Sequence, residues 1–227
     1  MCHSRLDNRS ACDLKRNMHR KIIASLKDIC NEQRRVNSRT LEAVIVLAIE
    51  IAREGREGRK IGTLFVVSDT EKTLSNSRCL MLDPLLHHPD EAKHIENPDL
   101  RETVKELAQL DGAFIVSDPG IVLSACRYIN ASSDCINLPL GLGSRHMAAA
   151  SITRLTDAVA VVVSESSIVR VFDDGEIIAE ILPELWLLRN FSLHLAQPYS
   201  RHSDHEMSIF ARNGILAKVE DKVQEMQ

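Results

Sequence analysis

An almost wholly apolar run, Ala158 to Val163, follows closely on an alanine-rich segment at residues 145–156, and this succession limits the chain to few folds. The alanine-rich segment has the length of a helix and begins after the turn Gly141-Leu142-Gly143. The apolar run has the length of a strand, and a strand that is apolar at every position is typical of the centre of a sheet. A helix leading into such a strand predicts an α/β fold in which helices flank the sheet.

Further strands are predicted on both sides of this pair. Thr63 to Val67 is a second short apolar run rich in β-forming residues. Two glycine-containing turns, Asp118-Pro119-Gly120 and Asp173-Asp174-Gly175, each separate two apolar runs and so predict hairpins. The hairpin strands are residues 112–117 with 121–126, and 169–172 with 176–181. Parallel and antiparallel connections together predict a mixed central β-sheet.

Helices are expected around this sheet. Residues 40–54 carry apolar side chains at helical spacing, and residues 13–35 also have a helical pattern. Asn97-Pro98 is a typical helix start, with Asn as the cap, and predicts a helix to about Leu110. We also expect N-terminal helices and a C-terminal helical segment, with a last helix near Met207 to Val223.

Charge and motif content exclude several function classes. Residues 1–40 hold ten Lys or Arg against four Asp or Glu, which leaves 18 against 28 in an acidic remainder. An acidic body with two Tyr and one Trp gives no strong nucleic-acid signal. No apolar run is long enough to cross a membrane, and no Cys-x-x-Cys pair occurs among six cysteines, so we expect a cytoplasmic protein. Walker-type and dinucleotide-binding glycine motifs are also absent.

Three short segments remain as candidate sites. Gly143-Ser144-Arg145-His146 at a helix start could cradle phosphate through backbone N–H groups and a guanidinium, or could be an ordinary turn. Asp111-Gly112, before a strand, suits a ribose hydroxyl or a metal ion, or is a simple Asp-Gly turn. Ser164-Glu165 ends the apolar strand: Glu165 could hold a divalent cation and Ser164 could donate to phosphate, or both are a solvated strand exit.

Taken in order, Asp111-Gly112-Ala113, Ser144-Arg145-His146 and Val163-Ser164-Glu165 resemble the diadenylate cyclase (DAC) domain, over roughly residues 60–182. The likeness is to the archaeal type, in which Gly-Leu-Gly precedes Arg-His and an Arg-Tyr pair such as Arg127-Tyr128 follows the first hairpin. Met147 departs from the bacterial Arg-His-Arg pattern and removes one positive charge.

The resemblance implies a nucleotidyltransferase that condenses two ATP into the second messenger cyclic di-AMP, with Mg²⁺ or Mn²⁺. The implied catalytic residues are Asp111, Arg145 and His146, and the implied metal ligands are Asp111 and Glu165. The implied ATP-binding residues are Gly112, Tyr128, Gly143, Ser144, Arg145, His146 and Ser164. Asp111 is the candidate general base or only a metal ligand, and Tyr128 is an adenine contact or a hairpin tyrosine.

The resemblance also implies a face-to-face dimer, because each protomer would hold one ATP. We expect three regions: a basic helical leader at 1–40, the nucleotide-binding domain at 41–185 and a C-terminal helical extension at 186–227. The alternative is a non-catalytic adenine-nucleotide-binding sensor module with the same fold. Retention of both acids, Asp111 and Glu165, favours the enzyme.

Overall fold

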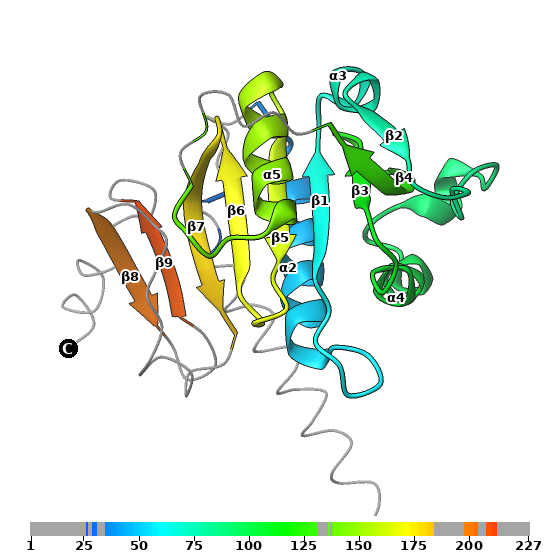
Figure 1. Cartoon of the computed structure of the whole chain (residues 1–227). Coiled ribbons are helices and arrows are strands. Elements are labelled where there is room, and N and C mark those ends of the chain that lie inside the picture. The colour runs from blue at the N-terminus through cyan, green and yellow to red at the C-terminus, as the bar shows by residue number, and fades with distance from the viewer. Residues whose placement is uncertain are drawn as a thin grey trace, which may run out of the picture.

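The chain is described by a computed structural model for residues 26, 29, 30, 35–130, 136, 138–183, 198–203 and 208–212. Within these ranges nine strands form one sheet in the order β2-β4-β3-β1-β5-β6-β7-β9-β8 (Figure 1). Strands β1 (Thr63–Val67) and β3 (Ala113–Val116) pair in parallel, and the other neighbouring strands pair antiparallel. The predicted mixed α/β architecture is confirmed.

The remaining strands are β2 (Ser77–Cys79), β4 (Val122–Ile129), β5 (Val159–Val163), β6 (Val169–Asp173), β7 (Glu176–Leu182), β8 (Tyr199–Ser203) and β9 (Ser208–Arg212). The helices are α2 (Ser38–Glu54), α3 (Thr70–Ser75), α4 (Pro98–Leu107) and α5 (Ser144–Leu155), with a short 3₁₀ helix at Asp90–Lys93.

Apart from Thr63, strands β1, β3 and β5 are apolar because helices cover both faces of the sheet. Figure 1 shows α5 in front of the central strands and α2 behind them. Along β1, Phe65 and Val67 belong to the core on the α2 side, whereas Leu64 and Val66 belong to the core on the α5 side. Alternate side chains of a strand point to opposite faces, so both sets are buried at once.

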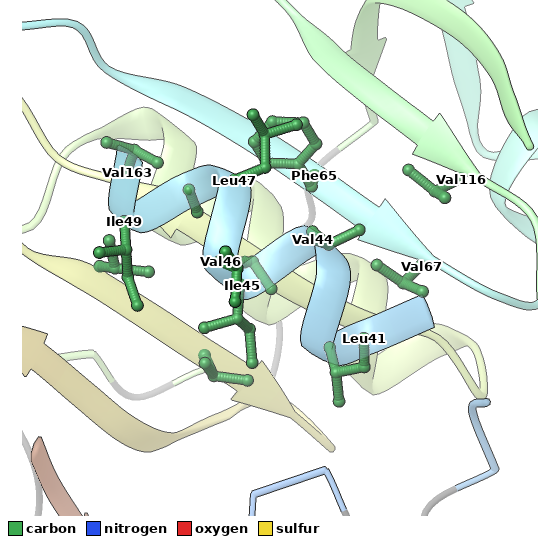
Figure 2. Close-up of a cluster of buried hydrophobic side chains, with 14 of the residues drawn as sticks. Leu41, Val44, Ile45, Val46, Leu47, Ile49, Phe65, Val67, Val116 and Val163 are labelled. Atoms are coloured by element: carbon green, nitrogen blue, oxygen red, sulfur yellow. The ribbon is translucent and has the colours of Figure 1, made fainter. Parts of the chain in front are cut away.

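The core under α2 is built from aliphatic side chains around one aromatic pair. Figure 2 shows Leu47 and Val44 of α2 lying over Phe65 and Val67 of β1. Phe65 also stacks on Phe114 of β3, with ring centroids 5.0 Å apart and an interplanar angle of 17°. This packing fixes β1 against β3. The candidate site lies at the edge of the sheet where these two parallel strands begin.

The helix boundaries follow from capping. Asn37 accepts hydrogen bonds from the backbone N–H groups of Arg39 and Thr40 at the start of α2. Asn97 caps α4 as predicted and accepts from the N–H of Asp99 at 3.0 Å. Helix α4 ends at Leu107, three residues before the predicted end, because the next residues form tighter turns toward Asp111.

Both predicted hairpins are confirmed. In the β6–β7 turn, Asp174 and Gly175 have φ values of 49° and 80°, which match the twist that two-residue hairpin turns require. In the β3–β4 turn, Gly120 has a φ of 93° and donates its N–H to the carbonyl of Ser117 at 2.9 Å.

The predicted helix near Met207 is wrong for residues 208–212, which form β9 and pair with β7. Ile209 and Ala211 pack on the α2 side and Phe210 on the α5 side, an alternation that suits a strand. The spacing of apolar residues in so short a run does not distinguish a helix from a strand. The strand forms because the backbone of β7 supplies hydrogen-bonding partners for residues 208–212. Residues 213–223 lie outside the described ranges, as does most of the predicted helix 13–35. Of the helices that are described, none is long and apolar enough to span a membrane.

Candidate active site

The three predicted site segments meet at one edge of the sheet. Parallel strands β1 and β3 begin at that edge, so Asp111, just before β3, lies beside the start of β1. Strand β5 runs antiparallel to β1, and Thr63 pairs with Val163, so β5 ends there with Glu165 just beyond it. Helix α5 also begins at this edge. Arg145 in its first turn forms ion pairs with both Asp111 and Glu165.

Arg145 is the centre of this arrangement. Its Nη2 donates to Oδ1 of Asp111 at 3.0 Å, and its Nη1 donates to Oε1 of Glu165 at 3.3 Å. The Arg145 side chain is 32% exposed, whereas those of Asp111 and Glu165 are 81% and 72% exposed. Exposed ion pairs contribute little to stability, so this trio is better suited to binding than to holding the fold together.

Glycine at position 62 leaves room for Arg145. A Cβ atom there would lie 2.8 Å from Nη1 of Arg145 and 3.2 Å from Cγ of Glu165. The sequence analysis missed Gly62. Its signal was a glycine directly before a buried strand, which often marks a close approach by another group.

Gly112 is required by the neighbouring strand. Its φ is 113°, and a Cβ atom there would lie 2.5 Å from the carbonyl carbon of Cys126 in β4. The register of β3 and β4 shifts after Ala113, and Cys126 itself has a φ of 54°. The irregular backbone of β4 therefore passes directly over Gly112, so that Asp111 is placed by a turn that only glycine fits.

A cavity of about 480 Å³ opens beside Arg145, within the usual range for small-molecule pockets. Five predicted site residues line this cavity: Asp111, Gly112, Tyr128, Ser144 and Arg145. The sequence analysis missed its apolar lining, which includes Leu64, Leu80, Ile129, Met147 and Ala148. Met147, the departure from the bacterial pattern, thus adds an apolar surface to the cavity.

Arg127 and Tyr128 are neighbours on β4 and both line the cavity, but their side chains make different contacts. Tyr128 is 44% exposed, lines the cavity and lies under the guanidinium of Arg78, 4.9 Å from the ring centroid. Arg127 donates to the carbonyls of Leu74 and Ser77, which holds β2 against β4. An aromatic ring with this exposure could stack on a nucleobase.

The structure does not bring His146 or Ser164 into the cavity lining. Gly143 and Glu165 also lie outside the lining, but Glu165 bonds Arg145, which lines the cavity. His146 is 7% exposed, and its ring lies 6.1 Å from that of Phe172 in β6. The hydroxyl of Ser164 is 2.7 Å from that of Ser166, and its N–H donates to the carbonyl of Ile168. Both residues therefore make contacts within the protein, beside the site.

Gly143 is the N-cap of α5 and is open on its outer side. Its φ of −83° does not require glycine, and a Cβ atom there would meet no heavy atom within 4 Å. The N–H groups of His146 and Met147 donate to the carbonyl of Gly143, and no side chain of the N-cap bonds the N–H groups that precede them. Such N–H groups at a helix start favour anions.

The two acids fit a nucleotide-borne cation better than a closed metal site. Within the described ranges, no group of three or more His, Cys, Asp or Glu could hold a metal. Mg²⁺ is commonly bound by one or two carboxylates together with substrate phosphates. Asp111 and Glu165, which share one guanidinium beside the cavity, match that ligand set.

Comparison with known proteins identifies the family of the chain. A family profile described as the DisA bacterial checkpoint controller nucleotide-binding domain (DAC) matches residues 50–177. A protein named diadenylate cyclase from Methanocaldococcus jannaschii is 48% identical over 151 residues, covering 66% of this chain and 48% of that protein. One of the same name from Haloferax volcanii is 41% identical over 155 residues, covering 67% and 56%. The chain thus spans about half the length of these relatives.

Solved structures with some likeness to the chain include a hypothetical membrane-spanning protein from Bacillus cereus, with 20% identity and a TM-score of 0.46. That match covers 61% of each chain. Another is a double mutant of DacA from Staphylococcus aureus, with 23% identity and a TM-score of 0.42, covering 61% of this chain and 84% of the other.

The profile match extends from within α2 to the start of β7 and takes in Asp111, Arg145 and Glu165. Because this match covers more than half of the chain, the chain belongs to the DAC family of nucleotide-binding domains.

Proposed function

We propose that the chain is a diadenylate cyclase, which condenses two ATP into cyclic di-AMP and two pyrophosphates. The observation that carries the proposal is the placement of Arg145 between Asp111 and Glu165 at the edge of the cavity. A guanidinium at a helix start can bind phosphate through two parallel hydrogen bonds. The two carboxylates beside it can ligate the divalent cation of a nucleotide and accept the proton of its reacting hydroxyl group.

The substrate would be bound by groups from several elements. We assign the triphosphate to Arg145, Ser144 and the open N–H groups that follow Gly143. The adenine ring would stack on the exposed face of Tyr128, and the apolar lining near Leu80 would cover its edge. His146 and Ser164, expected to bind phosphate directly, would instead support the elements that do.

The reaction would proceed by two equivalent displacements. The 3′-hydroxyl oxygen of each ATP attacks the α-phosphorus of the other, the bond to the bridging oxygen breaks and pyrophosphate leaves with the electron pair. Each hydroxyl gives up its proton, for which the exposed carboxylate of Asp111 is the candidate acceptor. Arg145 would stabilise the negative charge that develops on the phosphate oxygens.

A divalent cation, Mg²⁺ or Mn²⁺, would be held by Asp111 and Glu165 together with phosphate oxygens. When bound, such a cation neutralises phosphate charge and polarises the phosphorus centre. Replacing Glu165 by Gln should therefore raise the cation concentration that gives half-maximal rate.

Ring closure would need two protomers with facing cavities. Leu80 lines the cavity and is followed by exposed Met81 and Leu82, an apolar surface suited to a second copy of the chain. We expect the rate per protomer to fall on dilution in parallel with the dimer fraction measured by sedimentation. A constant rate per protomer in a demonstrably monomeric sample would contradict this part of the proposal.

We place the protein in the cytoplasm. Among the described residues, Cys30, Cys79 and Cys126 are free thiols, which supports a reducing compartment.

The displacement chemistry can be tested with a substrate that lacks the attacking group. 3′-Deoxy-ATP should bind in competition with ATP but yield no cyclic product, and ATP should give cyclic di-AMP with two pyrophosphates. Binding of ATP without any product from a dimeric sample would support the sensor module in place of the enzyme.

A further inference from the structure

Three polar side chains, none of which lines the cavity, are buried beneath the first turn of α5. His146 is 7% exposed, Arg170 of β6 is 3% exposed and Glu180 of β7 is fully buried. Nη1 of Arg170 lies 3.0 Å from Nε2 of His146, and Nε of Arg170 lies 2.5 Å from Oε1 of Glu180. The three side chains therefore link the start of α5 to two strands of the sheet.

The strand register places this group under α5. Arg170 pairs with Val162 of β5 and with Glu180 of β7. Val162 belongs to the core on the α5 side, as does Phe172, two residues beyond Arg170. Arg170 and Glu180 thus lie in the apolar core on the α5 side.

The protonation of His146 follows from its partner. A guanidinium has donors and no acceptor, so Nε2 of His146 must accept the hydrogen bond from Arg170. That nitrogen therefore carries no proton, and His146 is not among the residues that line the cavity. The imidazole is therefore arranged to hold Arg170 and not to contact a phosphate.

Burial of this ion pair needs a reason other than stability. Removing two charges from water is costly, and apolar side chains of similar size often replace a buried pair without loss of stability. A buried pair is better explained where it fixes the geometry of an element. Here the element is the helix start from which Arg145 projects.

The first turn of α5 is otherwise held by the ion pairs of Arg145, whose partners Asp111 and Glu165 are exposed. Gly143 makes no side-chain capping hydrogen bond, and Gly141 before it has a φ of 95°. In the preceding segment Leu142 packs against the core on the α5 side, whereas Leu140 is 98% exposed. An uncapped helix start frays unless tertiary contacts hold it.

We propose that Arg170 and Glu180 are positioning residues, which act through His146 to hold the first turn of α5 where Arg145 and the helix N–H groups meet the nucleotide phosphates. This inference rests on the proposed function for its catalytic consequence. Its structural part, the anchoring of the first turn, stands independently of the reaction.

The test replaces the ion pair by apolar side chains of similar size, Arg170→Met with Glu180→Leu. The double variant should remain folded, with a Tm within about 5 °C of the parent. We expect kcat for cyclic di-AMP formation to fall about 100-fold, because a small misplacement of a phosphate-binding group has that effect. Amide hydrogen exchange at His146 and Met147, whose N–H groups donate to the carbonyl of Gly143, should become faster.

A matched control lies at the other end of α5. Nη1 of Arg154 bonds Oδ1 of Asp174 at 2.6 Å, and the two side chains are 52% and 79% exposed. Arg154→Met with Asp174→Asn should change neither turnover nor exchange at His146 and Met147. Equal effects of the two double variants would overturn the proposal, as would normal turnover and normal exchange in the buried variant.

Substitutions of His146 decide between positioning and direct contact, and they apply even if the double variant does not fold. Gln can place an acceptor near the position of Nε2, whereas Phe cannot. We expect His146→Gln to retain at least about tenfold more activity than His146→Phe. Equal loss in two folded variants would mean that the imidazole itself acts on the substrate, and the proposal would be wrong. If the parent protein forms no cyclic di-AMP, the proposed function fails, while hydrogen exchange still decides whether the ion pair anchors the helix.

Discussion

Nη2 of Arg145 donates to Oδ1 of Asp111 at 3.0 Å across 34 residues of sequence. The pairing joins the start of α5 to the turn before β3, and Glu165 joins it from the end of β5. The guanidinium of Arg145 thus connects the three segments that were predicted to form the site.

Loss of the guanidinium should abolish most of the activity. In Arg145→Ala we expect kcat to fall about 100- to 1000-fold, because a donor to the developing phosphate charge is lost. Stability should change little, since the ion pairs of Arg145 are exposed. Steady-state kinetics and thermal unfolding of the same preparation measure both effects.

Arg154→Ala is the matched control for this substitution, because it removes an exposed arginine from the far end of the same helix. Near-normal turnover in Arg145→Ala, or an equal loss in Arg154→Ala, would refute the assignment of Arg145.

A methyl group at Gly112 should disturb both fold and site. Gly112→Ala would place Cβ within 2.5–2.7 Å of the β4 backbone at a φ of 113°. We expect the free energy of unfolding to fall by about 1–3 kcal/mol, with weakened ATP binding. Urea unfolding and calorimetric titration measure the two effects.

Gly58 is the control glycine, because its φ is 74° but a Cβ atom there would meet nothing within 4 Å. Gly58→Ala should carry only the cost of backbone strain, about 1 kcal/mol, and should bind ATP normally. If the two variants were equally stable and bound ATP equally, the close approach of β4 would not be what selects glycine.

The ring of Tyr128 should contribute to nucleotide affinity. Stacking of a base on an aromatic side chain is worth about 1–3 kcal/mol, so Tyr128→Ala should weaken ATP binding roughly 5- to 150-fold. Tyr128→Phe keeps the ring and should bind within about threefold of the parent. Comparable losses in both variants would point to the hydroxyl and away from stacking.

The ion pairs between α4 and its surroundings predict a pH dependence of stability. Hydrogen bonds from Lys105 and then from Arg56 hold the pKa of Glu102 below its usual value. A lowered carboxyl pKa stabilises the fold above the unfolded-state pKa, near 4.3, and this contribution is lost as pH falls through the folded-state pKa. The Glu102 side chain is 64% exposed, so the contribution should be below about 1 kcal/mol.

Urea unfolding of the parent and of Glu102→Gln at pH 6 and pH 3 isolates this effect. The stability difference between the two proteins should be largest at pH 6 and shrink toward pH 3. A difference that stays constant or grows on acidification would contradict the pairing.

The parts of the fold that local signals determine were predictable. Apolar runs such as Ala158 to Val163 and turns such as Asp173-Asp174-Gly175 specify strands and hairpins within a few residues. Strand β9 was not predicted, because its structure depends on pairing with β7, which the local sequence does not reveal.

The candidate site was predictable in part for a similar reason. Arg145 and His146 are adjacent in sequence, but consecutive helical residues point about 100° apart, so one faces the cavity and the other the sheet. The sequence also contains a pattern that indicates the buried partner of His146. Arg170 and Glu180 are opposite charges inside otherwise apolar hairpin strands, and such residues are rarely buried unless they are paired.

Formation of cyclic di-AMP at the site of Asp111 is the property on which the proposed function rests. Purified parent and Asp111→Asn proteins would be incubated with ATP and Mg²⁺ or Mn²⁺, and cyclic di-AMP and pyrophosphate quantified by mass spectrometry. We predict both products in a ratio of about one to two from the parent, and neither above background from a folded variant. A parent that binds ATP as a dimer yet forms no product, or a variant with normal turnover, would contradict the account.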